Sequence, residues 1–273
     1  MAQASAKPKA RVLIVAGSDS GGGAGIQADI KTVTALGGFA MTAVTAITVQ
    51  NTLGVTNVHT IPPQIVREQI EAVVGDLGAD AWKLGMLGSA THVRTVLESW
   101  QAVGANAPVV LDPVMIAKGG ASLLAEDAVE VIRDQLVPIA AIVTPNAPEA
   151  EALTGVEVRD LDGQMGAAEI LVEQLGAYSA LVKGGHIGGD TVRDVLLTRE
   201  GYRVFESARI DTRATHGTGC TLASAIAAHM AQGVAIEPAV EKGRAYLMEA
   251  IRQAPGLGQG HGPLGHNWPL KLP

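Results

Sequence analysis

The 273-residue sequence predicts an α/β protein in which a central, mainly parallel β-sheet is covered by helices on both faces. Short apolar runs, typical of buried strands, alternate with segments of helical spacing along almost the whole chain. Hydrophobic residues make up 47% of the chain and aromatic residues only 3%. The core must therefore consist of Ala, Val, Leu and Ile, with helices packed closely on the sheet.

In the first half of the chain, strands and helices follow each other in strict alternation. The first strand, residues 11–16, is an apolar run that stops at Gly17. A helix over residues 26–36 stops at a glycine pair, and a strand rich in Thr, Val and Ile follows at residues 41–49. The next elements are a helix at 64–74 entered through two prolines, a strand at 81–85, a helix at 91–100 and a strand at 108–112.

The second half continues the alternation and then changes to a hairpin. A turn at Glu200-Gly201 separates two short β-type runs, which indicates antiparallel strands at residues 192–197 and 202–205. The remaining elements, in order, are helices at 126–136, a strand at 140–143, helices near Glu149 and at 167–175, a strand at 180–183, and helices at 219–230 and 237–253.

No linker-like change in composition and no internal repeat interrupts this pattern, so we expect a single domain over residues 11–255. Residues 1–10 are small, polar and basic and are expected to form a disordered tail. Residues 256–273 contain Gly, Pro and two histidines and are expected to be irregular.

Charge and cysteine content exclude several classes of protein. A net charge of −7 disfavours a general nucleic-acid binder but is compatible with a small phosphorylated ligand. One cysteine excludes an internal disulfide and any site built on a cysteine pair. Because the sequence shows no charged-then-apolar leader and no bilayer-spanning apolar run, we expect a cytoplasmic protein.

Polar clusters follow six of the predicted strands, at the carboxyl ends where sheets of this kind bind ligands. One such cluster indicates only a turn. Six at one edge of a sheet, together with the glycine-rich loop at residues 216–220, indicate a binding site. The clusters begin at Gly17, Gln50, Gly85, Asp112, Thr144 and Lys183.

The loop at residues 216–220, here called the anion loop, contains Gly217, Thr218, Gly219 and Cys220 and precedes a helix of small residues. Its glycines let backbone N–H groups approach an anion, and the helix start adds unpaired N–H groups. Cys220 lies where a thiol ionises more easily. These features indicate phosphoryl transfer with Cys220 facing the acceptor hydroxyl. The motif alone equally fits a turn before a core helix with a buried structural cysteine.

Four further residues are candidates for the nucleotide side. Asn146 and Glu149 share a face at a helix start, where they suit water-mediated Mg²⁺ binding, although the same spacing is a capping box. Asp112 ends a buried strand, where a carboxylate is costly unless it is paired or binds a cation. Lys183 ends another strand and is compatible with binding a phosphate or with a solvated surface position.

Seven segments in this order resemble the ribokinase-like superfamily, and within it the hydroxymethylpyrimidine/phosphomethylpyrimidine kinase family of thiamine biosynthesis. The resemblance covers roughly residues 11–255 and implies a three-layer α/β/α fold, often dimeric. It also implies ATP as co-substrate with Mg²⁺, and two successive phosphorylations of 4-amino-5-hydroxymethyl-2-methylpyrimidine. The matching segments are residues 16–29, 49–52, 83–87, 111–115, 144–149, 182–186 and 216–221.

The resemblance also implies roles for individual residues. Asp29 and Gln50 are expected to hydrogen-bond the pyrimidine edge, whose alternating donors and acceptors suit a carboxylate beside an amide. The backbone N–H groups of the anion loop are expected to bind the transferred phosphoryl group. Gly17, Met86, Val114 and Cys220 are expected to line the substrate pocket, and Asn146, Glu149, Lys183 and Asp112 to serve the nucleotide and Mg²⁺.

Two questions stay open at this point. Cys220 stands where most sugar kinases of the superfamily carry an aspartate base, so either its thiolate accepts the hydroxyl proton or the cysteine only shapes the pocket. The alternative enzyme is a pyridoxal kinase of the same superfamily; a sugar kinase is disfavoured by Cys220. A sensor that binds the pyrimidine without phosphorylating it is the alternative outside catalysis, and the complete phosphate-side set of residues argues against it.

Overall fold

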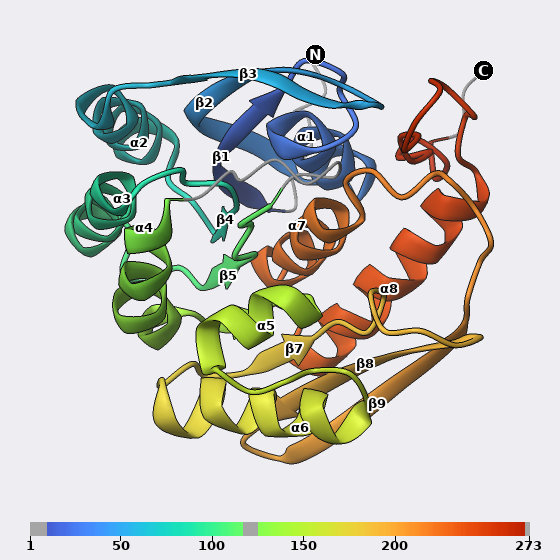
Figure 1. Cartoon of the computed structure of the whole chain (residues 1–273). Helices are drawn as coiled ribbons and strands as arrows, with labels where there is room; N and C mark the ends of the chain where they lie inside the picture. Colours follow the sequence, from blue (N-terminus) through green and yellow to red (C-terminus); the bar gives the residue numbers. More distant parts are fainter. Residues whose placement is uncertain (1–9, 117–124, 271–273) are drawn as a thin grey trace, which may run out of the picture.

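The computed structural model describes residues 10–116 and 125–270, so the predicted N-terminal tail lies outside the described residues except for Ala10. All nine described strands belong to one sheet (Figure 1). The strands are β1 (Arg11–Asp19), β2 (Phe39–Asn51), β3 (Gly54–Thr60), β4 (Ala81–Leu84), β5 (Val109–Leu111), β6 (Ile142–Val143), β7 (Ala180–Val182), β8 (Thr191–Thr198) and β9 (Gly201–Ala208).

The sheet has the order β3-β2-β1-β4-β5-β6-β7-β8-β9. The parallel strands are β2, β1, β4, β5, β6 and β7, whereas β3, β8 and β9 are antiparallel additions at the two edges. The chain moves outward from β1 in one direction to β2 and in the other to β4. This reversal opens a crevice at the carboxyl ends of the central strands, where such folds bind ligands.

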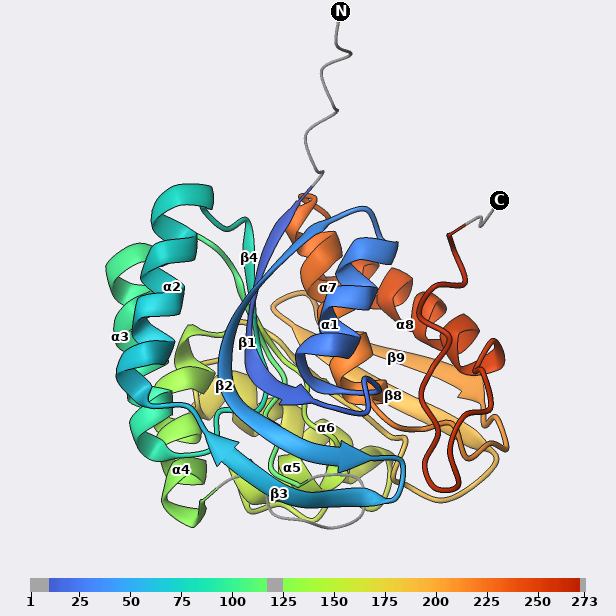
Figure 2. The ribbon, with the colours of Figure 1, turned by 90° about the horizontal axis from the view of Figure 1, so that it is seen from above.

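Helices cover both faces of the sheet, so the predicted three-layer α/β/α architecture is confirmed (Figure 2). One face carries the helices α1 (Gly25–Ala35), α7 (Thr218–Ala231) and α8 (Ile236–Arg252). The other face carries α2 (Pro63–Leu77), α3 (Ala90–Val103), α4 (Glu126–Val131), α5 (Ala147–Thr154) and α6 (Leu161–Glu169). In the described part of the chain, no helix is long and apolar enough to cross a bilayer.

The uninterrupted apolar run of strand β1 contributes side chains to the hydrophobic core on both faces of the sheet. Val12 and Ile14 pack with the α1, α7 and α8 side of the core, and Leu13 and Val15 pack with the opposite side. All four side chains are fully buried. Because successive side chains of a strand alternate between faces, a strand in the middle of three layers must be apolar at every position.

Two segments differ from the expectation. Strand β3 was not predicted, because five of its seven residues are exposed and it therefore lacks the apolar pattern of a buried strand. The described part of the segment after α8, up to residue 270, contains no long helix or strand, but Leu264 and His266 in it are buried against the body of the protein.

Candidate active site

A cavity of about 620 Å³ lies at the carboxyl ends of the parallel strands. Its wall brings together segments more than 200 residues apart in the sequence, from β1 to α8. Every predicted site residue except Asp29 contributes to this wall: Gly17, Gln50, Met86, Asp112, Val114, Asn146, Glu149, Lys183, Gly217, Thr218, Gly219 and Cys220.

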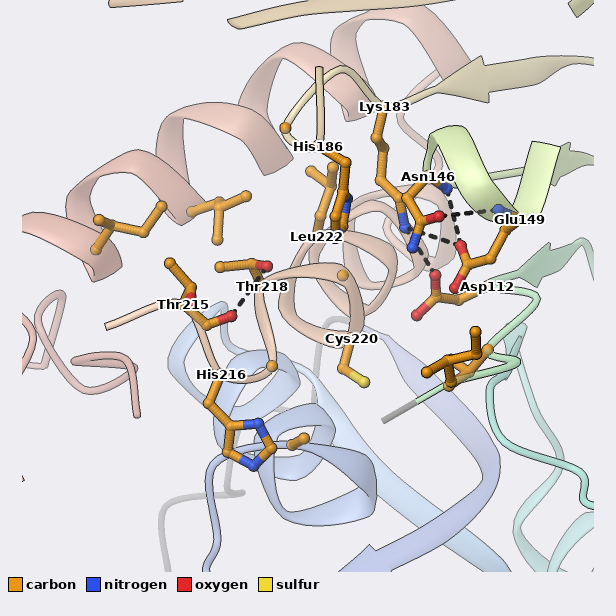
Figure 3. Close-up of a pocket in the computed structure, with 18 of the residues that line it drawn as sticks. Asp112, Asn146, Glu149, Lys183, His186, Thr215, His216, Thr218, Cys220 and Leu222 are labelled. Atoms are coloured by element: carbon orange, nitrogen blue, oxygen red, sulfur yellow. Dashed lines mark hydrogen bonds and ion pairs between the residues drawn. The ribbon is translucent and has the colours of Figure 1, made fainter. Parts of the chain in front are cut away.

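The anion loop forms one side of the cavity and leads directly into α7 (Figure 3). Gly217 is the residue before the helix and has a φ of +80°, and a Cβ atom there would lie 1.9 Å from the Gly23 carbonyl oxygen. Only glycine satisfies both conditions. The Thr218 hydroxyl donates to the Thr215 carbonyl at 3.3 Å. The first backbone N–H groups of α7 are therefore held at the cavity wall as donors for an anion.

Lys183 faces the anion loop from the end of β7. Its Nζ donates to Asp112 Oδ1 at 3.0 Å and lies 4.0 Å from Glu149 Oε2. A Cβ atom at Gly219 would lie 3.2 Å from Lys183 Nζ, so the loop backbone and the ammonium group border the same space. Burial lowers the pKa of Lys183, but the two carboxylates outweigh it and raise the pKa, so the side chain stays a cation.

The predicted capping box at α5 is present. Asn146 Oδ1 accepts from the Glu149 N–H at 3.0 Å, and Glu149 Oε2 accepts from the Asn146 N–H at 2.8 Å. Burial raises the pKa of Glu149 to about 7, with Lys183 opposing that shift. The cap thus holds the carboxylate in place at the cavity wall (Figure 3).

The carboxylates fit a hard divalent cation. Asp112 Oδ2 is buried and has no hydrogen-bond partner among the described residues, which is costly unless a cation binds there. Glu149 supplies a second carboxylate at the same wall, and oxygen ligands are those that Mg²⁺ prefers. The residues present therefore suit Mg²⁺ held beside the phosphates of a nucleotide.

Cys220 is half-buried in the first turn of α7, and its thiol points toward the cavity (Figure 3). Burial raises the pKa of the thiol to about 12, although the nearby Lys83 ammonium opposes this shift. The expectation that this thiol ionises more easily is therefore wrong, because desolvation outweighs the Lys83 charge that favours the thiolate. The cysteine is a neutral thiol at physiological pH.

The cavity is also lined by Gly17, Met86 and Gln50. A Cβ atom at Gly17 would lie 2.8 Å from Met86 Sδ, so the glycine allows the methionine to cover β1. Gln50 Oε1 accepts from the Thr48 hydroxyl at 2.9 Å, and its Nε2 lies 3.4 Å from His216 Nε2. These contacts hold the Gln50 amide at the cavity wall.

Asp29 does not lie where the sequence predicted. It is fully buried, does not line the cavity, and uses Oδ2 to pair with Lys83 at 3.0 Å and Oδ1 to accept from Ser224 at 2.7 Å. Both oxygens are occupied inside the protein. The predicted hydrogen bond from Asp29 to the pyrimidine is therefore replaced by a supporting contact behind the site, which the sequence pattern did not indicate.

Asp19 and His216 join the two glycine-rich loops of the site. Asp19 Oδ2 lies 2.8 Å from His216 Nε2, and its carboxylate also accepts from the N–H groups of Gly21, Gly23 and Ala24. Desolvation raises the pKa of Asp19, but the His216 and backbone hydrogen bonds outweigh it and lower the pKa. In the sequence, Asp19 lies two residues before the glycine-rich segment at 21–25, and this position is the local signal for the contact.

The wall of the cavity formed by α8 was not predicted. Leu247, Met248 and Ile251 line the cavity together with Arg244. The Arg244 Nε donates to Asp194 Oδ2 at 2.7 Å, and Asp194 Oδ1 accepts from the Gly184 N–H beside Lys183. In the sequence these apolar residues have the spacing of an ordinary amphipathic helix, so nothing distinguished them from core residues.

A reversing parallel sheet, an anion-binding helix start and a lysine–carboxylate cluster at one crevice define the ribokinase-like class of small-molecule kinases. The family model described as phosphomethylpyrimidine kinase matches residues 19–265 of this chain. The chain therefore belongs to the phosphomethylpyrimidine kinase family.

Individual relatives agree with this assignment. The chain is 46% identical to the hydroxymethylpyrimidine/phosphomethylpyrimidine kinase of Bacillus subtilis, over 94% of each chain. It is 48% identical to the thiamine biosynthesis bifunctional protein ThiED of Geobacter sulfurreducens over 95% of its own length, but spans only 52% of that protein. An ADP complex of Bacillus subtilis pyridoxal kinase superimposes with a TM-score of 0.86 at 35% identity, covering 94% of this chain and 97% of the other.

Proposed function

We propose that this protein transfers the γ-phosphoryl group of ATP to 4-amino-5-hydroxymethyl-2-methylpyrimidine and then to the resulting monophosphate, in thiamine biosynthesis. The observation that carries this function is the cluster of Lys183, Asp112 and Glu149 facing the N–H groups of the anion loop across one cavity. Membership of the phosphomethylpyrimidine kinase family supports the choice of substrate. The phosphoryl group is transferred between the loop and the lysine.

Each part of the site has a distinct role in this reaction. The oxygen of the hydroxymethyl group attacks the γ-phosphorus while the bond from that phosphorus to the ADP oxygen breaks. The N–H groups of Gly217, Gly219 and Cys220 stabilise the charge on the transferred group, and Lys183 acts as a point charge. Asp112 and Glu149, beside Asn146, are the residues that would hold Mg²⁺, and the bound ion would neutralise phosphate charge.

The Cys220 thiol lines the pocket rather than acting as the base. Its pKa, raised to about 12 by burial, supports a protonated thiol that does not take up the hydroxyl proton. The proton of the acceptor hydroxyl then passes to an oxygen of the transferred phosphoryl group. Thr218 contributes by fixing the loop through its hydrogen bond to Thr215.

Gln50 recognises the pyrimidine edge in this proposal, with Gly17, Met86 and Val114 as the apolar walls around the ring. An amide presents both a donor and an acceptor and therefore suits an aminopyrimidine. Asp29 supports this site from behind through Lys83.

A coupled assay with purified protein, ATP and Mg²⁺ tests the function. Hydroxymethylpyrimidine, its monophosphate and pyridoxal are offered separately, and the products are resolved by mass. Phosphate gain by both pyrimidines supports the proposal, and EDTA should abolish it. If neither pyrimidine nor pyridoxal is phosphorylated while the pyrimidine still binds in calorimetry, the protein is a sensor and the proposal is wrong.

Pyridoxal kinase is the second candidate activity. Its support is the close superposition on the Bacillus subtilis pyridoxal kinase. Pyridoxal, like the pyrimidine, is a small heteroaromatic ring with a hydroxymethyl group. If pyridoxal is the only compound phosphorylated in the same assay, the protein is a pyridoxal kinase, and Gln50 does not recognise a pyrimidine substrate.

We also propose that the protein is a cytoplasmic homodimer. The edge strand β3 has unpaired backbone groups, and the exposed apolar side chains of Ile47, Val49 and Leu53 gather on and beside the neighbouring β2. A second copy of the chain would cover them. Light scattering of the purified protein tests the dimer, and the double variant Ile47→Asp/Val49→Asp should be monomeric. The cytoplasmic location, where ATP is available, is tested separately by cell fractionation.

A further inference from the structure

The C-terminal segment after α8 contacts the anion loop at both of its ends. In Figure 2 this segment, dark red, passes beside the turn between β2 and β3. Two of its histidines, His261 and His266, reach residues on either side of Gly217–Cys220. Neither histidine had a recognisable partner in the sequence.

His261 lies at the entrance of the anion loop. Its Nδ1 is 3.1 Å from the Thr215 hydroxyl, and the adjacent Gly262 N–H donates to the Arg213 carbonyl at 3.0 Å. The His216 N–H in turn donates to the Gly262 carbonyl at 3.1 Å. The residues that lead into the loop are thus paired with the C-terminal segment by backbone and side chain together.

His266 lies at the exit of the loop. Its Nε2 is 2.9 Å from the hydroxyl of Thr221, the residue that follows Cys220. The ring is buried, and the Tyr246 hydroxyl donates to the His266 carbonyl at 2.6 Å, which anchors the histidine to α8. Burial, with the nearby Lys31, lowers the pKa of His266 to about 4, so the ring is neutral at physiological pH.

The same segment also reaches the substrate side. The His261 N–H donates to the Thr52 carbonyl at 2.8 Å, two residues beyond Gln50. A Cβ atom at Gly260 would lie 2.1 Å from the Thr52 carbonyl oxygen, so the two backbones are in close contact. The segment therefore links the turn after Gln50 to the anion loop.

We propose that His261 and His266 are positioning residues that hold the two ends of the anion loop, so that its N–H groups keep the geometry required at the transferred phosphoryl group. The inference rests on the proposed function. Two glycines within four residues give the loop conformational freedom that would be costly to lose at each turnover. Donors fixed beforehand stabilise developing charge without that cost. His266 is buried and hydrogen-bonds Thr221, the residue after Cys220, so it contributes more to holding the loop than His261 does.

Paired substitutions at one hydrogen bond test this proposal. Thr221→Val and His266→Leu remove the bond, whereas Thr221→Ser and His266→Gln keep a polar group in reach. Exposed Gln101 on α3, far from the cavity and from β3, provides the matched control Gln101→Leu. In Thr221→Val and in His266→Leu we expect kcat for pyrimidine phosphorylation to fall about five- to tenfold, with KM for the pyrimidine changed by less than about twofold. In Thr221→Ser, His266→Gln and the control variant, kcat and KM should stay near the wild-type values.

The double variant Thr221→Val/His266→Leu should be no slower than the worse single variant, because both changes break the same bond. Melting temperatures are measured for every variant, with kinetics taken well below the lowest. A lower melting temperature with unchanged kcat would mean that the segment only stabilises the fold, and would overturn the proposal.

Hydrogen exchange of the amides of residues 217–220 separates this inference from the proposed function. Faster exchange in His266→Leu than in His266→Gln is expected without any substrate present. If the wild type phosphorylates none of the substrates offered, the proposed function fails, and the exchange result still decides whether the histidine holds the loop. Equal exchange in the two variants would overturn the positioning role.

Discussion

Lys83 and Asp29 form an ion pair of 3.0 Å in which neither side chain reaches solvent. Ser224, one helical turn after Cys220, donates a second hydrogen bond of 2.7 Å to the same carboxylate. The pair thus joins β4, α1 and α7 beneath the anion loop. Burial lowers the pKa of Lys83, but the nearby negative charges, Asp29 first among them and Asp112 as well, together outweigh it, raise that pKa and keep the lysine charged.

Asp29→Asn should destabilise the protein strongly, because it leaves a buried ammonium group without a counter-charge. We expect a loss of about 3–5 kcal/mol in the free energy of unfolding, measured by urea denaturation. Glu206→Gln, which removes the exposed pair between Arg193 and Glu206, is the matched control and should cost less than about 1 kcal/mol. Similar losses in the free energy of unfolding for the two variants would show that the buried ion pair stabilises the protein no more than an exposed one.

Cys220→Ala should retain much of the activity, because the thiol is neutral and lines the pocket. General-base catalysis contributes about 10²–10⁴-fold, so we expect the loss in kcat to stay below about 100-fold, with an unchanged pH profile. Steady-state kinetics from pH 6 to 9 provide the measurement. A larger loss, or the disappearance of an ionisation from the profile, would restore the thiolate as the base.

Gly217→Ala should abolish catalysis. The residue has a φ of +80°, and the new Cβ would meet the Gly23 carbonyl oxygen at 1.9 Å, so the anion loop must move. Loss of positioned donors is expected to lower kcat/KM by at least about 10²-fold. Gly75→Ala in α2, where a Cβ meets nothing within 4 Å, is the control and should leave kcat/KM unchanged. Near-normal turnover by Gly217→Ala would contradict the geometry described for the loop.

His266 should make the protein sensitive to acid. Its pKa is about 4 in the folded protein and 6.5 when exposed, so between these values the unfolded chain binds more protons. Stability is therefore complete above about pH 6.5 and falls as the pH drops toward 4, by at most about 1.4 kcal/mol per pH unit from this group. Urea denaturation of wild type and His266→Gln over this range measures the difference. Parallel curves would mean that the histidine is not desolvated.

Every described strand except β3, and most of the described helices, were predicted from the sequence. Apolar runs such as residues 11–16 have only one stable place, a sheet covered on both faces, and Val12 and Leu13 do point into opposite layers. Because parallel strands end at one edge, the polar residues after them, including Asp112 and Lys183, were expected to meet, and they form an ion pair. The single domain over residues 11–255 stays a prediction.

Sequence patterns failed where the outcome depended on contacts distant in the chain. Strand β3 is an exposed edge whose pattern is not apolar, and only its pairing with β2 makes it a strand. Leu247, Met248 and Ile251 of α8 have the spacing of core residues in the sequence and instead line the cavity. A histidine in an irregular tail carries no local signal, yet His266 meets Thr221 across 45 residues.

The order of helices and strands along this chain was determined by the sequence, since hydrophobic periodicity and glycine-rich turns depend on residues that are close together in the chain. The electrostatic state of the site was decided by the tertiary structure. Whether Asp29 faces a ligand or Lys83, and whether the Cys220 thiol ionises, depends on how much water and which charges remain around each group after packing. Desolvation is a property of the assembled protein and cannot be read from the spacing of residues.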